Sequence, residues 1–147
     1  MDVVADLEAP CGADEMFAWV DDLERYPSWL DIVSRAEPWP EEADDGPAWR
    51  IDLRGRLGPL ARSKRLRMVR TELDAPRKVT FERRELDGRQ HAAWRLQAEI
   101  ADTSAGTTLT MRLHYGGGLW GPVLERVLGD EIQRSRPRLL ALLASPE

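Results

Sequence analysis

The stretch Gly116-Gly117-Gly118-Leu119-Trp120-Gly121-Pro122, followed by a helical pattern up to Leu143, decides the fold of this 147-residue chain. Pro122 suits a first helical turn, where its missing N–H removes no internal hydrogen bond. We expect a helix over about residues 120–143, which would be ~36 Å long. Its apolar residues recur at spacings of three and four, the stripe of an amphipathic helix: Val123, Leu124, Val127, Leu128, Ile132, Leu139, Leu142 and Leu143.

Pro137 lies inside this helical pattern. A proline there removes a backbone hydrogen bond and clashes with the preceding turn, so a kink is expected near Gln133. The alternative is a helix that ends near Ser135, with a second helix starting at Pro137. In either case the apolar face needs a large concave partner.

The chain before this helix has the period of two that is typical of half-buried strands. Pro38 and Pro40 confine one of these strands to a sheet edge, and Asp87-Gly88 indicates a hairpin. Short strands joined by tight turns are antiparallel neighbours. The expected strands cover residues 3–8, 36–40, 49–53, 61–73, 79–86, 92–100 and 109–115.

Two short helices are expected after the first strand, one opening at Asp14 and one over Ser28 to Val33 after Pro27. Segregated helices and strands are typical of the α+β class. We expect one domain over residues 1–147, in which a curved antiparallel sheet of about seven strands wraps around the C-terminal helix. A cavity is expected between the sheet and the helix.

Composition bounds the setting of the chain. Cys11 is the single cysteine and there are two histidines, so an internal disulfide is excluded and a zinc site is implausible. No segment approaches ~20 consecutive apolar residues, so no stable membrane insertion is expected. No secretory signal is expected at residues 1–4, which lack a basic region and a long apolar run, and a reduced cytoplasmic setting is expected.

The net charge of −5 hides an asymmetry along the chain. Residues 1–47 hold 14 acidic and 2 basic residues, whereas residues 54–84 hold 11 basic and 3 acidic residues. The basic residues alternate along strands without interleaved aromatic residues, so no nucleic-acid partner is expected. They are interpreted as the solvated outer face of the sheet; a binding surface for a protein partner is the alternative.

The order strand, two helices, strands, long helix occurs together with the stretch Phe17-Ala18-Trp19-Val20-Asp21-Asp22-Leu23-Glu24-Arg25-Tyr26-Pro27-Ser28-Trp29-Leu30, which follows Ala9-Pro10. This combination resembles the START-like superfamily of polyketide cyclases/dehydrases, lipid-transfer domains and the birch-pollen allergen. The resemblance covers the whole chain in element order. It implies a helix-grip fold with a hydrophobic cavity, but no particular reaction, because the superfamily holds enzymes and carriers alike.

Aromatic residues are the first candidates for the cavity wall, since six Trp are present. Trp brings a large apolar area and an N–H that needs a partner. Ordinary core packing is the alternative role. The expected ligand-binding residues are Tyr26, Trp29, Trp49, Ile51, Phe81, Arg83, Trp94, Leu96, Met111, Leu113, Trp120 and Leu124.

The register of the strand 61–73 stays open. If Leu66 and Met68 face the cavity, Arg70 does too, whereas an inward Val69 would bring Arg65 and Arg67 with it. Arg83 shares a face with Val79 and Phe81. A buried Arg must be paired, either with a carboxylate of the protein or with an oxygen of a ligand.

In the cyclases that the chain resembles, an Arg and hydroxyl-bearing side chains hold the oxygens of a polyketide. Tyr26, Tyr115 and Thr71 are the available hydroxyls, and His91 and His114 are expected at the rim and on the outer face. No phosphate-loop, dinucleotide or nucleophile-elbow motif is present, so no cofactor and no metal are expected.

Three functions remain. The first is binding of a small hydrophobic ligand, aromatic, polyketide-like or acyl, by a monomer or homodimer. The second is an aromatase/cyclase or dehydrase that uses cavity Arg and Tyr residues. The third is a subunit or chaperone-like role of the basic sheet surface.

Overall fold

The computed structural model of the chain describes residues 1–39, 46–54, 64–117 and 121–144, with only the backbone for Val123 and Leu124. Seven strands, two α-helices and one 3-10 helix (η1) are formed within these residues. The elements are β1 (Asp2–Ala9), α1 (Ala13–Phe17), η1 (Leu23–Ser28), β2 (Val33–Pro38), β3 (Ala48–Leu53), β4 (Lys64–Asp74), β5 (Lys78–Arg83), β6 (Trp94–Thr103), β7 (Gly106–Tyr115) and α2 (Gly121–Ala144).

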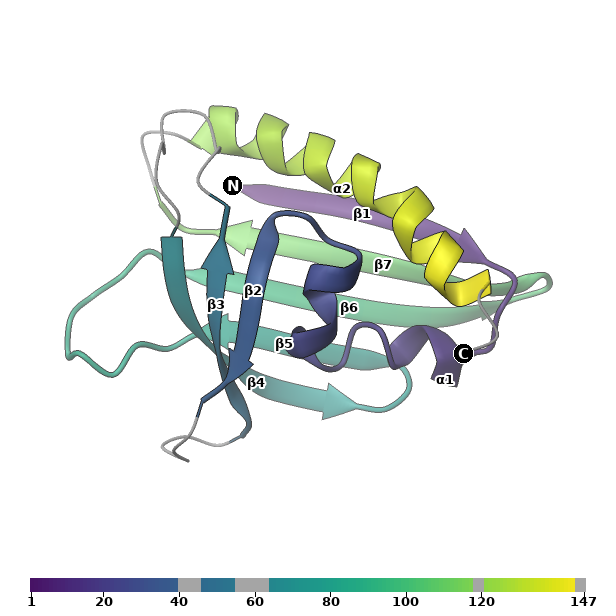
Figure 1. Cartoon of the computed structure of the whole chain (residues 1–147), viewed down its shortest axis with the longest axis horizontal. Coiled ribbons are helices and arrows are strands. Elements are labelled where there is room, and N and C mark those ends of the chain that lie inside the picture. The colour runs from purple at the N-terminus through teal and green to yellow at the C-terminus, as the bar shows by residue number, and fades with distance from the viewer. Residues whose placement is uncertain (40–45, 55–63, 118–120, 145–147) are drawn as a thin grey trace.

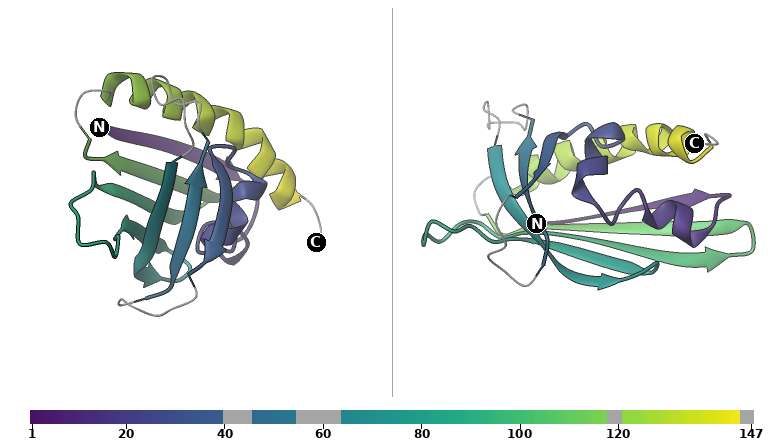
Figure 2. Two further views of the ribbon diagram at one scale, coloured as in Figure 1. Left: turned by 60° about the vertical axis from the view of Figure 1, so that its left-hand side comes forward. Right: turned by 60° about the horizontal axis from the view of Figure 1, so that its bottom comes forward.

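The strands form one antiparallel sheet in the order β1-β7-β6-β5-β4-β3-β2. The sheet is curved, and α2 lies along its concave side beside β1 (Figure 1). The right-hand view of Figure 2 shows α1 and η1 on that same side of the sheet. The α+β helix-grip architecture expected from the sequence is confirmed. Pro38 ends β2, which is an edge strand as predicted.

The alternation of apolar residues along the strands builds the concave face. On the β1–β7 ladder, Val3 lies opposite Leu113 and Leu7 lies opposite Leu109, and these four side chains point inward toward α2. Side chains on a strand alternate between faces, so these positions recur every second residue.

The structure settles the register of β4. Leu66 and Met68 point into the space under α2, whereas Arg67 and Val69 are buried on the opposite face. Arg70 shares the concave face with Met68, and its guanidinium donates to the carbonyl oxygen of Asp21 at 3.1 Å. The guanidinium of the inward-facing Arg70 is therefore hydrogen-bonded to the backbone.

α2 continues as one helix from Gly121 to Ala144, so the alternative of a helix that ends near Ser135 with a second one starting at Pro137 was wrong (Figure 1). Gln133 and Pro137 both lie on the exposed side of the helix. The carbonyl of Gln133, which Pro137 leaves without its helical donor, therefore faces water that can hydrogen-bond to it. Leu128 and Leu139, only 1% and 2% exposed, anchor the opposite side of α2 on the sheet.

Two predicted boundaries were also wrong. The second short helix is η1, which begins after Asp22 and contains Pro27, because the Asp22 carboxylate accepts from the backbone N–H of Glu24 at 2.9 Å. The Asp87-Gly88 turn lies in the loop 84–93 rather than directly between strands, because β5 ends at Arg83 and β6 begins at Trp94. None of the helices in the described part of the chain has the length and apolar character that a membrane crossing requires.

The turn between β6 and β7 requires glycine at one position. Gly106 has φ +148°, and a Cβ there would lie 2.2 Å from the carbonyl oxygen of Ala9. We expect Gly106→Ala to lower the free energy of unfolding by at least about 2 kcal/mol, through clash and backbone strain. Gly129→Ala is the control, since a Cβ on this α2 residue meets no atom within 4 Å.

The control should stabilise the protein by about 0.5–1 kcal/mol, because glycine is a poor helix former. Urea unfolding of both variants measures the two values. Equal stability of Gly106→Ala and the wild type would contradict the close approach of this turn to Ala9.

Candidate functional site

A cavity of about 80 Å³ lies between the concave face of the sheet and α2, and we call it the central cavity. Its walls come from η1 and the segment after it, from β2, β3, β4, β6 and β7, and from α2. Apart from the Tyr26 ring, every described side chain around it is non-titratable and predominantly apolar. The lining residues are Leu23, Tyr26, Trp29, Leu30, Ile32, Val33, Ile51, Leu53, Leu66, Met68, Trp94, Leu96, Met111, Leu113, Leu128 and Ile132.

Seven residues expected from the sequence to bind ligand lie around the central cavity: Tyr26, Trp29, Ile51, Trp94, Leu96, Met111 and Leu113. Trp120 and the side chain of Leu124 lie outside the described residues. The sequence reasoning missed nine lining residues: Leu23, Leu30, Ile32, Val33, Leu53, Leu66, Met68, Leu128 and Ile132. The helical stripe pointed to Leu128 and Ile132, and the period of β3 pointed to Leu53.

Trp49 and Phe81 share the concave face but lie in an aromatic cluster instead of the cavity wall. The ring centroids of Trp49 and Phe81 are 5.6 Å apart, and Phe81 meets Tyr26 edge-on at 6.2 Å. Tyr26 then packs on Trp29 at 5.0 Å. Such tilted and edge-on pairs are favourable beyond their buried area. The cluster therefore supports the wall of the cavity from behind.

The hydroxyl of Tyr26 is committed to the backbone. It donates to the carbonyl oxygen of Val20 at 2.8 Å, inside the core. Burial raises the pKa of Tyr26 well above its ordinary value of 10.0, with the nearby carboxylates of Asp21 and Asp22 adding to the effect. The phenol is thus a poor proton donor toward a ligand.

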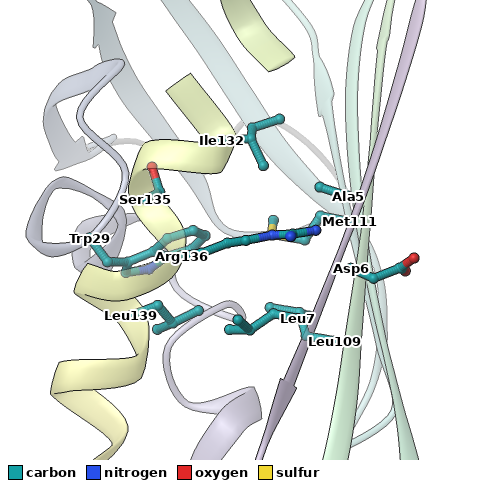
Figure 3. Close-up of a pocket in the computed structure, with 10 residues that line it drawn as sticks. All are labelled: Ala5, Asp6, Leu7, Trp29, Leu109, Met111, Ile132, Ser135, Arg136 and Leu139. Carbon is teal, nitrogen blue, oxygen red and sulfur yellow. The ribbon is translucent and has the colours of Figure 1, made fainter. Parts of the chain in front are cut away.

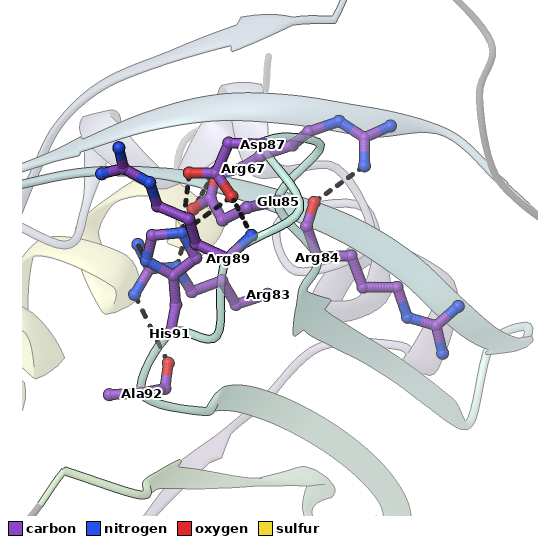
Figure 4. Close-up of polar contacts among 8 residues, drawn as sticks. All are labelled: Arg67, Arg83, Arg84, Glu85, Asp87, Arg89, His91 and Ala92. Carbon is purple, nitrogen blue, oxygen red and sulfur yellow. Dashed lines mark hydrogen bonds and ion pairs between the residues drawn. The ribbon is translucent and has the colours of Figure 1, made fainter.

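Arg83 is buried, with only 8% of its side chain exposed, and it does not line the central cavity. Its Nε donates to the Glu85 carboxylate at 2.7 Å, so the protein supplies the carboxylate that a buried Arg requires (Figure 4). The same Glu85 oxygen accepts the backbone N–H of Arg67 at 3.2 Å. Glu85 therefore links the start of the loop 84–93 to both Arg83 and β4.

The two histidines lie near surface carboxylates. Nδ1 of His91 lies 3.4 Å from the Arg83 guanidinium, which can only donate, and Nε2 lies 2.8 Å from Asp87 (Figure 4). His114 pairs with Asp2 at 2.9 Å on the outer face. Neither histidine is among the described residues around the central cavity.

The other hydroxyls named from the sequence are also occupied or displaced from the cavity. Thr71 donates to the Glu82 carboxylate at 2.6 Å. Tyr115 packs on Trp94, with ring centroids 4.6 Å apart. The indole N–H of Trp94, a residue around the central cavity, is buried and has no hydrogen-bond partner in the described chain.

A second hollow of about 30 Å³, which we call the side pocket, opens between α2 and β1 (Figure 3). It shares Trp29, Met111 and Ile132 with the central cavity, so the two spaces adjoin. The side pocket is also lined by Ala5, Asp6, Leu7, Leu109, Ser135, Arg136 and Leu139. In the described ranges, no group of three His, Cys, Asp or Glu side chains could hold a metal ion.

The model of the polyketide cyclase/dehydrase and lipid-transport family matches residues 1–143. The chain belongs to this family. The family joins polyketide cyclases or dehydrases with lipid-transport proteins, and membership alone does not choose between these two activities. No curated protein has a significantly similar sequence.

Solved structures share the fold at low sequence identity. A START superfamily protein from Mycobacterium smegmatis is 16% identical, with TM-score 0.72 and coverage of 97% of this chain and 96% of its own. The protein TTHA0849 from Thermus thermophilus is 16% identical, with TM-score 0.70 and coverage of 99% and 100%. DynU16, a putative protein in the dynemicin biosynthetic locus, is 16% identical with TM-score 0.65; the match covers 99% of this chain and 48% of that one.

The raised pKa of Tyr26 predicts a loss of stability at alkaline pH. The unfolded chain releases the phenol proton near pH 10, whereas the folded chain keeps it, so this stabilisation is complete below pH 10 and is lost as pH rises toward the folded pKa. Tyr26→Phe should remove this part of the alkaline loss. It should also cost about 1–3 kcal/mol at neutral pH, because the Val20 carbonyl loses its donor.

Urea unfolding of both proteins from pH 8 to pH 11 measures the effect. Tyr115→Phe is the matched control, and it should lose stability at high pH as the wild type does. An identical pH profile for Tyr26→Phe and the wild type would contradict the buried, protonated phenol.

Proposed function

We propose that the chain acts as one ligand-binding domain that holds a small hydrophobic molecule in the central cavity. The observation that carries this proposal is the lining, which is apolar from every element that contributes to it. Ligand sites are typically concave, predominantly apolar and supplied with few polar groups. The Trp94 indole N–H, buried without a partner in the described chain, is the candidate donor to such a ligand.

The size of the cavity indicates how a ligand is accommodated. An engineered apolar cavity of ~150 Å³ admits benzene, and the central cavity is about 80 Å³. A ligand larger than a single ring therefore requires the wall to move outward. α2 is the candidate for this movement, because it contributes only Leu128 and Ile132 among the described lining residues. The surface ion pair Arg138–Asp31 would hold α2 to the segment after η1 in the closed form.

The cyclase or dehydrase alternative has weaker support at the residues that would perform it. It needs an Arg and a hydroxyl facing the substrate. The Tyr26 hydroxyl instead donates to Val20, and Arg83 is paired with Glu85 away from the central cavity. Binding without chemical change is therefore the function that the geometry favours.

Binding is tested with the neutral dye N-phenyl-1-naphthylamine, which fluoresces in apolar surroundings. The wild type should enhance its fluorescence in a saturable way. Leu113→Trp places a large ring in the cavity and should weaken binding at least about tenfold, as expected when a bulky group takes the ligand's volume. Val4→Trp is the control, since Val4 is 53% exposed on the outer side of β1.

Both variants are checked by circular dichroism, which should show the wild-type fold. Equal dye binding by Leu113→Trp and the wild type would contradict the central cavity as the site. Native mass spectrometry before and after denaturing extraction then identifies a co-purified molecule. Conversion of a poly-β-ketone by the wild type, lost in Arg83→Gln, would overturn binding without turnover.

A further inference from the structure

Arg136 is a charged residue placed in an apolar space. Figure 3 shows its side chain extending from α2 across the side pocket toward β1. Leu7, Met111 and Leu139 are among the pocket residues around it. Its Nε is buried and has no hydrogen-bond partner within the described residues.

The neighbouring arginines of α2 behave differently. Arg134 pairs with Glu131 at 2.8 Å, and Arg138 pairs with Asp31. No ion pair is formed by Arg136 with any described carboxylate. Asp6 lines the same pocket, but Figure 3 shows its carboxylate turned away from Arg136, and it accepts instead from Thr110 at 2.8 Å.

Arg136 is partly exposed, so the cost falls on its buried Nε–H. A buried N–H without an acceptor is unfavourable, and a buried Arg group normally meets an anion. The protein supplies one to Arg83, through Glu85, and backbone carbonyl oxygen to Arg70. Arg136 has a free buried N–H and a pocket in front of it. This is the arrangement expected where the anion arrives with a ligand.

The side pocket and the central cavity lie in line. Along β7, Leu113 lines the central cavity, Met111 lines both spaces and Leu109 lines the side pocket. Along α2 the same order is Leu128, Ile132 and Arg136. Leu128 and Arg136 are about 12 Å apart along the helix at ~1.5 Å per residue. An extended apolar chain that fills the cavity can thus end at Arg136.

We infer that the ligand is an amphipathic carboxylic acid, with its apolar body in the central cavity and its carboxylate on Arg136. This inference rests on the proposed function and adds the chemical class of the ligand. The Arg136 fork would bind the two carboxylate oxygens, as Arg does at bidentate sites. Arg136 is a binding residue here, and no reaction is assigned to it.

The test compares decanoate with 1-decanol, which shares its apolar chain and carries no charge at neutral pH. Isothermal titration at pH 7.5 should give decanoate an affinity at least about tenfold higher than decanol for the wild type, as charge-assisted hydrogen bonds provide. In Arg136→Met this preference should disappear, with decanol binding retained. Arg136→Lys, which keeps the charge but not the fork, should fall between the two.

Arg126→Met is the matched control, because Arg126 is an exposed residue of the same helix and its loss changes the net charge equally. It should retain the preference for decanoate. A decanoate preference that survives in Arg136→Met, or equal binding of both probes by the wild type, overturns the role of Arg136 and leaves the cavity function standing. Failure of the wild type to bind either probe or the neutral dye overturns the proposed function itself.

Discussion

The apolar face of α2 against the curved sheet is the contact on which the rest of the structure depends. Leu128 and Leu139 are almost fully buried there, and the strands supply the opposing residues at every second position. Removing this area from water is the main favourable term in folding. The helix and the curved sheet do not fill the space between them completely, and the central cavity lies there.

Three arginines on the concave side of the sheet differ in the groups that surround their guanidinium. Arg70 reaches a backbone oxygen, Arg83 has its own carboxylate, and Arg136 has a pocket. The folded chain itself supplies the hydrogen-bond acceptors of Arg70 and Arg83. Of these three, Arg136 is the one whose buried Nε–H has no acceptor within the described residues.

The fold was largely predictable from the sequence, because period two and period 3.6 separate the strands from α2. The register of β4 was not, since Arg65, Arg67 and Arg70 lie on both faces and the apolar residues between them fit either choice. The buried Arg67 guanidinium on the convex side donates to the carbonyl oxygen of Arg84, which is distant in sequence.

The candidate site was predictable only in part. Residues at regular strand positions, such as Leu96 and Met111, were found from their period. Ile32 and Val33 come from the irregular segment after η1 and the start of β2, where there is no period to read. Arg136 was not singled out, because a basic residue on an amphipathic helix normally reaches solvent. Its position becomes informative only when the pocket between α2 and β1 is known.

The modest volume of the central cavity has a kinetic consequence. If α2 must swing outward before a molecule fits, entry is limited by how often the helix opens and not by diffusion. The same opening then governs departure, so a bound molecule would be held for the lifetime of the closed form. Release could be hastened by anything that loosens the surface tie between Arg138 and Asp31. The opening rate of α2 would thus set the rates of both uptake and release.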